Sequence, residues 1–155
     1  MAANSTNGRN NTCTRMSAKR IWSRLRRTVK LSRIGGTLGN ILVTDDDKTC
    51  RDSIQKVLER EGHIVQTADS VDGAVNALDH HRFDLVFCDY RMPGKTGLDL
   101  LIELKRRRSS VPVLMMSAQA DAQIEQSILQ LGALELMRKP IRRRELIDRA
   151  AKITC

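Results

Sequence analysis

The chain has 155 residues, of which 41% are hydrophobic but only 3% aromatic, and a formal net charge of +9. This length and composition allow one domain with an aliphatic core, and no segment approaches the roughly 20 apolar residues of a transmembrane helix. The four cysteines lack the spacing of a disulfide framework or a metal site, so we expect reduced thiols and a cytoplasmic protein.

The positive charge is confined to the first part of the chain. Residues 1–40 contain nine Lys or Arg residues and no Asp or Glu, so the remaining 27 − 9 = 18 basic residues balance all 18 acidic ones. We therefore predict a basic N-terminal extension over residues 1–39, joined to a domain of zero net charge over residues 40–155.

The extension supports several interpretations. Its first 15 residues are rich in Asn, Ser, Thr and Gly, which is typical of disorder. Ile21, Trp22, Leu25 and Val29 then lie at helical spacing among basic residues, so part of the segment is a candidate amphipathic helix. Disorder with incidental charge is the simplest interpretation. Contact with nucleic acid, an anionic membrane or a partner protein stays open, as do a transit peptide and an upstream start-site error.

From residue 41 onward, apolar runs alternate with segments of helical periodicity. Strands are predicted at 41–44, 63–68, 84–88, 111–116 and 134–137, and helices at 48–61, 71–81, 98–108, 121–131 and 142–153. The first, third and fourth strands are continuous apolar runs, as expected of strands covered on both faces. The predicted fold class is therefore α/β: a doubly wound, five-stranded parallel sheet with helices on both faces.

Polar side chains follow four of these strands. They are Asp45 and Asp46 after the first strand, Asp89 after the third, Ser117 after the fourth and Lys139 after the fifth. The carboxyl ends of parallel strands lie at one edge of a sheet, where ligands of doubly wound folds bind, so we expect these five residues to converge.

The chemistry of this set favours a metal ion and an anion. Clustered carboxylates repel one another unless a cation joins them, and all-oxygen ligands suit Mg²⁺. With an ammonium and a hydroxyl nearby, Asp89 could act as a nucleophile toward a phosphoryl group. The alternatives are strand-end turn carboxylates and an acidic helix N-terminus, a role that we assign to Asp47 alone. The histidines His63, His80 and His81 are expected at the surface.

Residues 41–153 resemble the receiver domain of two-component response regulators, which has a (βα)5 flavodoxin-like fold. The resemblance rests on ILVTDDD (41–47), DLVFCDYRMPGKTGLDLL (84–101), VPVLMMSA (111–118), LGA (131–133) and RKP (138–140), in the family's order and spacing. It covers about three-quarters of the chain, and the motifs are specific when taken together.

The resemblance implies roles for the acidic residues. Asp89 would be the phospho-acceptor. Asp46 would be the more direct Mg²⁺ ligand, while Asp45 would act mainly through water. Asp89 itself and the backbone carbonyl of Arg91 would complete the protein's share of the metal site.

It also implies roles for the remaining site residues. Ser117 would be the switch hydroxyl that moves to the phosphoryl group, and Lys139 would pair with that group ahead of a cis peptide bond to Pro140. Family members often carry an aromatic residue at the position of Leu136, so switching through an aromatic ring is not expected here. Arg91 and Gln119 occupy positions that tune dephosphorylation.

The implied function is that of a signalling module, not an enzyme acting on a separate substrate. A sensor histidine kinase or histidine phosphotransfer protein would phosphorylate it. With no output domain after residue 155, it would act as a single-domain regulator on a downstream protein through helix 4, strand 5 and helix 5 of the domain (121–131, 134–137 and 142–153). One alternative is a nucleic-acid- or membrane-associated regulator acting through the basic extension. The other is a hydrolase with an aspartate nucleophile, against which stands the lack of a substrate-covering segment.

Overall fold

The computed structural model describes residues 38–119 and 121–154. The predictions for the basic extension therefore lie outside the described residues, except at its last two positions. None of the described helices combines the length and apolar character that crossing a bilayer requires.

Five strands form a single parallel sheet in the order β2-β1-β3-β4-β5. The strands are β1 (Asn40–Thr44), β2 (Ile64–Ala68), β3 (Leu85–Asp89), β4 (Val113–Ser117) and β5 (Glu135–Arg138). The helices that connect them are α2 (Lys48–Arg60), α3 (Val71–His80), α4 (Gly97–Arg106) and α5 (Ala122–Gln130), and α6 (Arg143–Ile153) follows β5. The chain order reverses direction in the sheet between β1 and β3, which makes the carboxyl ends of these two strands the topological switch point.

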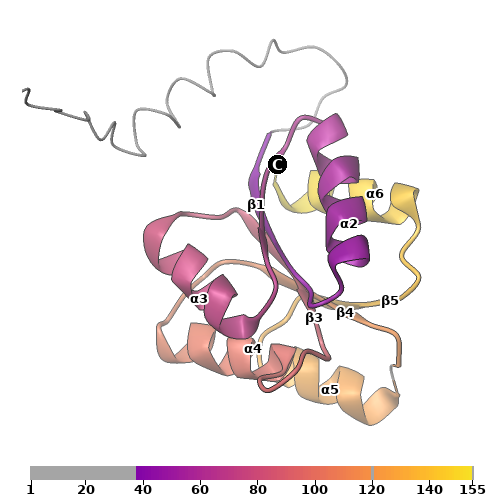
Figure 1. The fold of residues 1–155 in the computed structure, drawn as a ribbon. Helices are drawn as coiled ribbons and strands as arrows, with labels where there is room; N and C mark the ends of the chain where they lie inside the picture. The colour runs from indigo at the N-terminus through magenta and orange to yellow at the C-terminus, as the bar shows by residue number, and fades with distance from the viewer. Residues whose placement is uncertain (1–37, 120, 155) are drawn as a thin grey trace, which may run out of the picture. The chain divides into compact units, whose positions relative to one another are not determined.

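The helices cover both faces of the sheet, which confirms the predicted fold class (Figure 1). Helices α2 and α6 pack on one face through Leu58 and Leu146, against the odd-numbered β1 residues Ile41 and Val43. Helices α3, α4 and α5 cover the other face, where Leu42 belongs to the core. The alternation of β1 side chains between the two cores follows from the two-residue period of a strand, and each fully buried Leu contributes roughly 2 kcal/mol.

Element boundaries differ from the predictions by a few residues. Strand β4 begins at Val113, not at residue 111, and the carbonyl of Pro112 accepts a hydrogen bond from the N–H of Val86. Helix α5 begins at Ala122 because Asp121 is its N-cap, where the carboxylate accepts a hydrogen bond from the N–H of Ile124. Asp89 and Ser117 are the last residues of their strands and do not follow them.

The expected surface position of His63 is wrong. This side chain is only 9% exposed, and its Nδ1 accepts a hydrogen bond of 3.2 Å from the backbone N–H of Gly39. The histidine precedes β2 and Gly39 precedes β1, so the parallel pairing of these neighbouring strands brings the two together. His80 is exposed, as predicted, and His81 is half-buried.

Candidate functional site

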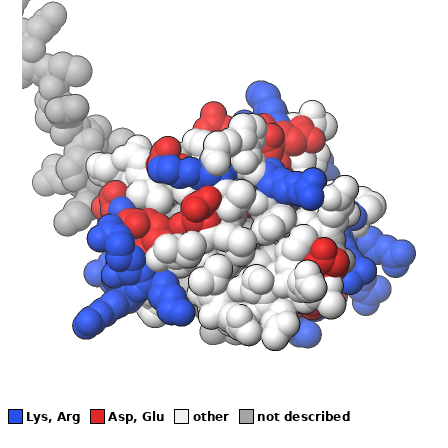
Figure 2. Space-filling model, turned by 90° about the horizontal axis from the view of Figure 1, so that it is seen from below, with Lys and Arg blue, Asp and Glu red and all other residues white. Residues whose placement is uncertain are grey.

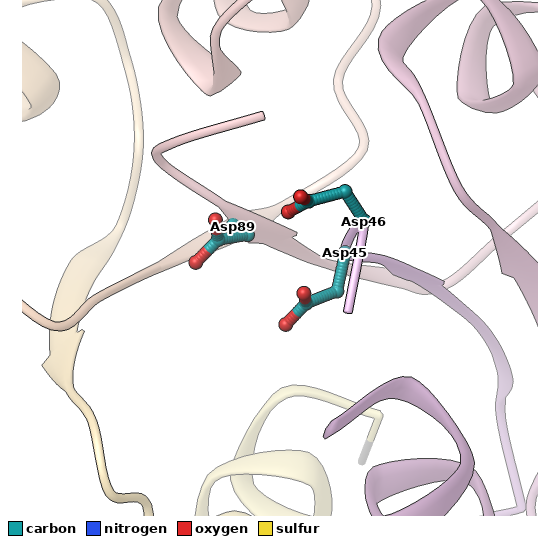
Figure 3. A group of neighbouring side chains, drawn as sticks. All are labelled: Asp45, Asp46 and Asp89. Carbon is teal, nitrogen blue, oxygen red and sulfur yellow. The ribbon is translucent and has the colours of Figure 1, made fainter. Parts of the chain in front are cut away.

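The ends of β1 and β3 bring three carboxylates together. Thr44 pairs with Cys88 in the sheet, so Asp45 and Asp46 follow β1 beside Asp89, the last residue of β3. One carboxylate oxygen from each aspartate lies within 4.8 Å of the others. Figure 3 shows Asp45 and Asp46 extending from the end of β1 toward the same region as Asp89. The predicted convergence of the acidic residues is therefore present in the structure.

Asp45 is the buried member of the acidic pair, and protein donors occupy both of its oxygens. Oδ1 accepts a hydrogen bond of 2.9 Å from the N–H of Asp47, and Oδ2 lies 2.7 Å from Nζ of Lys139. A buried carboxylate needs such partners to remain charged. Because both oxygens are already engaged, Asp45 is less suited than a free carboxylate to direct metal ligation.

Asp46 differs from both of its neighbours. Its side chain is exposed, and its carboxylate accepts no hydrogen bond from the described residues. The next residue, Asp47, is the N-cap of α2, with Oδ1 accepting from the N–H of Thr49 at 2.8 Å. The predicted division of the three consecutive aspartates is thus seen in their contacts: Asp47 caps the helix, whereas Asp46 reaches the cluster with a free carboxylate.

Asp89 is buried and held from two sides. Its Oδ1 lies 2.6 Å from Nζ of Lys139, and its Oδ2 accepts a hydrogen bond of 3.0 Å from the N–H of Arg91. Burial raises the pKa of this carboxyl group above its usual value, and the ion pair with Lys139 opposes that shift. For Lys139, burial favours the neutral amine, but the bonds to Asp45 and Asp89 outweigh it and raise the pKa. The site therefore contains a charged ammonium between two carboxylates.

Ser117 ends β4, the neighbour of β3 in the sheet, and Lys139 follows β5, the next strand along. The carbonyl of Ser117 accepts a hydrogen bond of 2.8 Å from the N–H of Lys139, which ties the end of β4 to the residue after β5. The Ser117 hydroxyl donates to the carbonyl of Gln119 at 2.5 Å and accepts from the Gln119 N–H at 3.2 Å. It is thus engaged within its own loop. The peptide bond between Lys139 and Pro140 is cis, as predicted.

The donor set fits a hard divalent cation. All three candidate ligands are carboxylates, and Asp46 leaves its oxygens free of protein donors in the described part of the chain. Mg²⁺ prefers oxygen ligands and commonly uses only one or two carboxylates, with water completing its shell. The backbone of Arg91 lies against Asp89 through its N–H, whereas a metal-ligating role for its carbonyl stays a prediction.

The sequence interpretation missed two residues of α2 that contact the acidic loop. The guanidinium of Arg51 donates hydrogen bonds to the carbonyls of Asp45 and Asp46. Burial, together with the neighbouring Asp45, raises the pKa of the Cys50 thiol to about 12, so this cysteine is a protonated, unreactive neighbour of the site. A cation in the first turn of a helix, where the dipole disfavours it, was the available indication for Arg51.

The molecular face in Figure 2 carries Asp and Glu side chains interspersed with separate groups of Lys and Arg. This distribution agrees with the zero net charge of residues 41–155. The basic group at the lower left of this face lies next to acidic side chains.

Comparisons with known proteins agree on one family. A family model described as the response regulator receiver domain matches residues 41–151. The chain is 36% identical over 104 residues to the transcriptional regulatory protein FixJ of Bradyrhizobium diazoefficiens, covering 67% of this chain and 51% of that protein. It is 33% identical to the cyclic di-GMP phosphodiesterase response regulator RpfG of Xanthomonas campestris, covering 74% of this chain and 31% of that protein. The chain thus spans about half, or less, of these relatives' length.

Solved structures give the same result for the fold. A CheY-like response regulator receiver domain protein from Methanospirillum hungatei superposes with a TM-score of 0.71 at 27% identity, covering 75% of this chain and 93% of that one. The receiver domain of the Francisella response regulator 1452 gives a TM-score of 0.72 at 27% identity, covering 75% and 96%. Both similarities extend over nearly the whole of the solved chains and over three-quarters of this one.

Proposed function

The chain belongs to the response regulator receiver family, the signalling modules of two-component systems, and on this premise we propose that Asp89 is its phospho-acceptor. The observation that carries the proposal is the placement of Asp89 within 2.6 Å of Lys139 and beside Asp45 and Asp46. A nucleophilic carboxylate, an ammonium and a set of metal-binding oxygens are the groups that phosphoryl transfer needs.

In the proposed reaction, a carboxylate oxygen of Asp89 attacks the phosphorus of a phosphohistidine. The P–N bond breaks and its electron pair stays on that imidazole nitrogen, while the other ring nitrogen keeps its proton, so neutral histidine is released. The product is an acyl phosphate on Asp89. Lys139 already forms an ion pair with Oδ1 of Asp89, so its ammonium is close enough to form an ion pair with a phosphoryl oxygen on that residue.

Asp46 and Asp89 are the proposed direct ligands of Mg²⁺, together with the backbone carbonyl of Arg91, and Asp45 acts through water. When bound, Mg²⁺ would offset the charge on the phosphoryl oxygens. The free carboxylate of Asp46 and the fully engaged carboxylate of Asp45 support this division.

Ser117 is the proposed switch residue. Its hydroxyl must leave the carbonyl of Gln119 to reach a phosphoryl group on Asp89, so phosphorylation would rearrange the loop after β4. Leu136 of β5 pairs with Met115 of β4, two residues before Ser117, and is only 9% exposed within the core. Transmission of the change through packing of this aliphatic side chain, and not through rotation of an aromatic ring, is part of the proposal.

The proposed partners are a histidine kinase or phosphotransfer protein upstream and a target protein downstream. The downstream contact would use α5, β5 and α6, next to the Ser117 loop. Two large apolar side chains of this region are exposed, Leu129 near the end of α5 at 44% and Leu134 directly before β5 at 54%. Exposed apolar residues of this size suit the apolar centre of a protein interface.

The deciding experiment is incubation of the full chain with acetyl phosphate and Mg²⁺, followed by intact-mass analysis. The wild type should gain one phosphoryl group, and Asp89→Asn should gain none. Asp84→Asn is the matched control. Asp84 directly precedes β3, at the end of the strand opposite to Asp89, and among the described residues its carboxylate accepts a hydrogen bond only from the N–H of Asn40. Labelling of Asp89→Asn, or loss of labelling in Asp84→Asn alone, would contradict the assignment.

A further inference from the structure

Arg51 occupies an electrostatically unfavourable place in the fold. It lies in the fourth position of α2, which begins at Lys48 and carries no acidic residue in its first turn. The amino-terminal end of a helix disfavours a positive charge. Lys48 is paired with Asp52 at 2.5 Å, but Arg51 forms no ion pair with any described residue.

The contacts of Arg51 are instead with the backbone of the acidic loop. Its Nη1 donates to the carbonyl of Asp45 at 2.5 Å and to the carbonyl of Asp46 at 3.3 Å. The side chain is half-buried, so water competes only in part for these charge-assisted hydrogen bonds.

These two carbonyls belong to the two peptide planes that flank the Cα atom of Asp46. Each peptide unit is rigid, so holding both planes restricts the two backbone torsions of Asp46 and thereby the direction of its side chain. This restraint is important at Asp46, because its carboxylate accepts no hydrogen bond from the described residues. Asp45, by contrast, is oriented by Asp47 and Lys139 through its own carboxylate.

We propose that Arg51 is a positioning residue that aims Asp46 at the space beside Asp89 and so sets the affinity of the site for a divalent cation. The inference rests on the proposed function, since it concerns the same metal site. Arg51 does not contact the cation or the phosphoryl group; it acts through the peptide groups on either side of Asp46.

The test is a calorimetric titration of the unphosphorylated full chain with Mg²⁺. Arg51→Gln should bind about tenfold more weakly than the wild type, the usual effect of losing a residue that orients a metal ligand. Arg51→Lys should fall between the two, because an ammonium keeps the charge but its Nζ lies one bond nearer the main chain than Nη1 of arginine and reaches the two carbonyls less well. Arg60→Gln is the matched control: it removes the same charge from an exposed position at the other end of α2 and should bind like the wild type.

A second measurement separates positioning from loss of fold. At saturating Mg²⁺, the rate of phosphorylation by acetyl phosphate should be close to that of the wild type in Arg51→Gln, while the half-saturating Mg²⁺ concentration rises about tenfold. Far-ultraviolet circular dichroism verifies that each variant is folded, and Arg51→Lys replaces the Gln variant if the latter is not.

The outcomes distinguish the two proposals. Wild-type Mg²⁺ affinity in both folded Arg51 variants would overturn the role of Arg51 and leave the proposed function intact. A wild type that binds no Mg²⁺ would overturn the metal site of the proposed function, and the role of Arg51 with it. An equal loss of affinity in Arg60→Gln would assign the effect to net charge and would also overturn the positioning role.

Discussion

The ammonium group of Lys139 lies between two buried carboxylates, 2.7 Å from Oδ2 of Asp45 and 2.6 Å from Oδ1 of Asp89. The lysine follows β5, whereas the aspartates lie at the ends of β1 and β3, so the contact joins three strand ends of the sheet. This cation reduces the repulsion between the two carboxylates and provides each with a charged hydrogen-bond donor.

Substitution Lys139→Ala should therefore destabilise the protein in the absence of divalent cations. Two carboxylates that are 1% and 7% exposed would lose their shared partner, at a cost of about 2 kcal/mol in the free energy of unfolding. Urea unfolding in EDTA measures the loss, and added Mg²⁺ should stabilise this variant more than the wild type. Lys95→Ala is the control, because Lys95 pairs with Asp72 at the exposed surface. Equal effects of the two substitutions would contradict the structural role of Lys139.

Asp46→Asn should largely abolish the increase in the free energy of unfolding that Mg²⁺ gives the wild type. Removing this charge relieves repulsion within the acidic cluster without breaking a hydrogen bond to the described residues, so stability in EDTA should be equal to or higher than that of the wild type. A saturating Mg²⁺ concentration, 100-fold above the dissociation constant, should stabilise the wild type by about 2.7 kcal/mol and the variant by far less.

The adjacent substitution Asp47→Asn provides the control for Asp46→Asn. Asparagine caps helices as well as aspartate does, so the bond to the N–H of Thr49 can be kept. This variant should retain the full stabilisation by Mg²⁺ in thermal unfolding. If both variants lost it, net charge and not ligation would explain the Mg²⁺ effect.

Much of the site was predictable, because an apolar run that ends in a charged residue indicates a buried strand with that residue at its carboxyl end. Asp89 after Leu85–Cys88 and Asp45 after Ile41–Thr44 are examples, since continuous apolar strands imply a parallel sheet and a common edge. Asp45 is buried and hydrogen-bonded, whereas Asp46 is exposed with a free carboxylate. This difference depends on burial and on Lys139, which is 94 residues away from Asp45 in the chain. The resemblance to receiver domains, and not the pattern of residues, suggested which aspartate would bind a metal ion more directly.

The residues that were missed act on backbone atoms. Arg51 bonds two carbonyls and His63 accepts from the N–H of Gly39. Such contacts have no complementary side chain in the sequence to indicate them, and His63 also stands next to a strand whose burial pattern is only partial. Side-chain pairs at strand ends can be predicted from alternation, whereas these contacts require the path of the backbone.

Gly97→Ala should disturb Asp89, the proposed phospho-acceptor, directly. Gly97 begins α4, and a Cβ atom there would lie 2.5 Å from the carbonyl oxygen of Asp89 and 2.3 Å from Cε of Met115. The methionine can move, but the strand backbone can do so only by displacing Asp89. We expect a loss of about 2 kcal/mol in the free energy of unfolding and slower phosphorylation by acetyl phosphate at saturating Mg²⁺.

The control for this prediction is Gly73→Ala in the first turn of α3. The nearest atoms to the new Cβ atom would be side-chain atoms: Oγ of Ser70 at 3.1 Å, Cβ of Ala68 at 3.5 Å and Oδ1 of Asp69 at 3.6 Å. Alanine is favoured over glycine in a helix by about 0.5–1 kcal/mol, so this variant should be as stable as the wild type or more so. Urea unfolding gives the free energy of unfolding of both variants. Equal losses of stability in Gly97→Ala and Gly73→Ala would contradict a specific role for the close approach of α4 to Asp89.

His63 should make the domain less stable as the pH falls below neutrality. Burial lowers the pKa of its imidazole below the ordinary value of 6.5, while Glu61 acts in the opposite direction. The unfolded chain then binds more protons than the folded one, so stability rises with pH. The contribution is complete above pH 6.5 and is lost as the pH falls toward the lowered pKa of the folded state, where protonated Nδ1 can no longer accept from Gly39.

The measurement is the free energy of unfolding of His63→Gln and of the wild type between pH 7.5 and 5. At the upper end the variant should be less stable by about 1 kcal/mol, the value of one hydrogen bond. The difference should shrink as the pH falls, because only the wild type has this histidine to protonate. His80→Gln, which alters an exposed ring on α3, should follow the wild-type profile. A constant difference between His63→Gln and the wild type across the range would show that His63 does not titrate with unfolding.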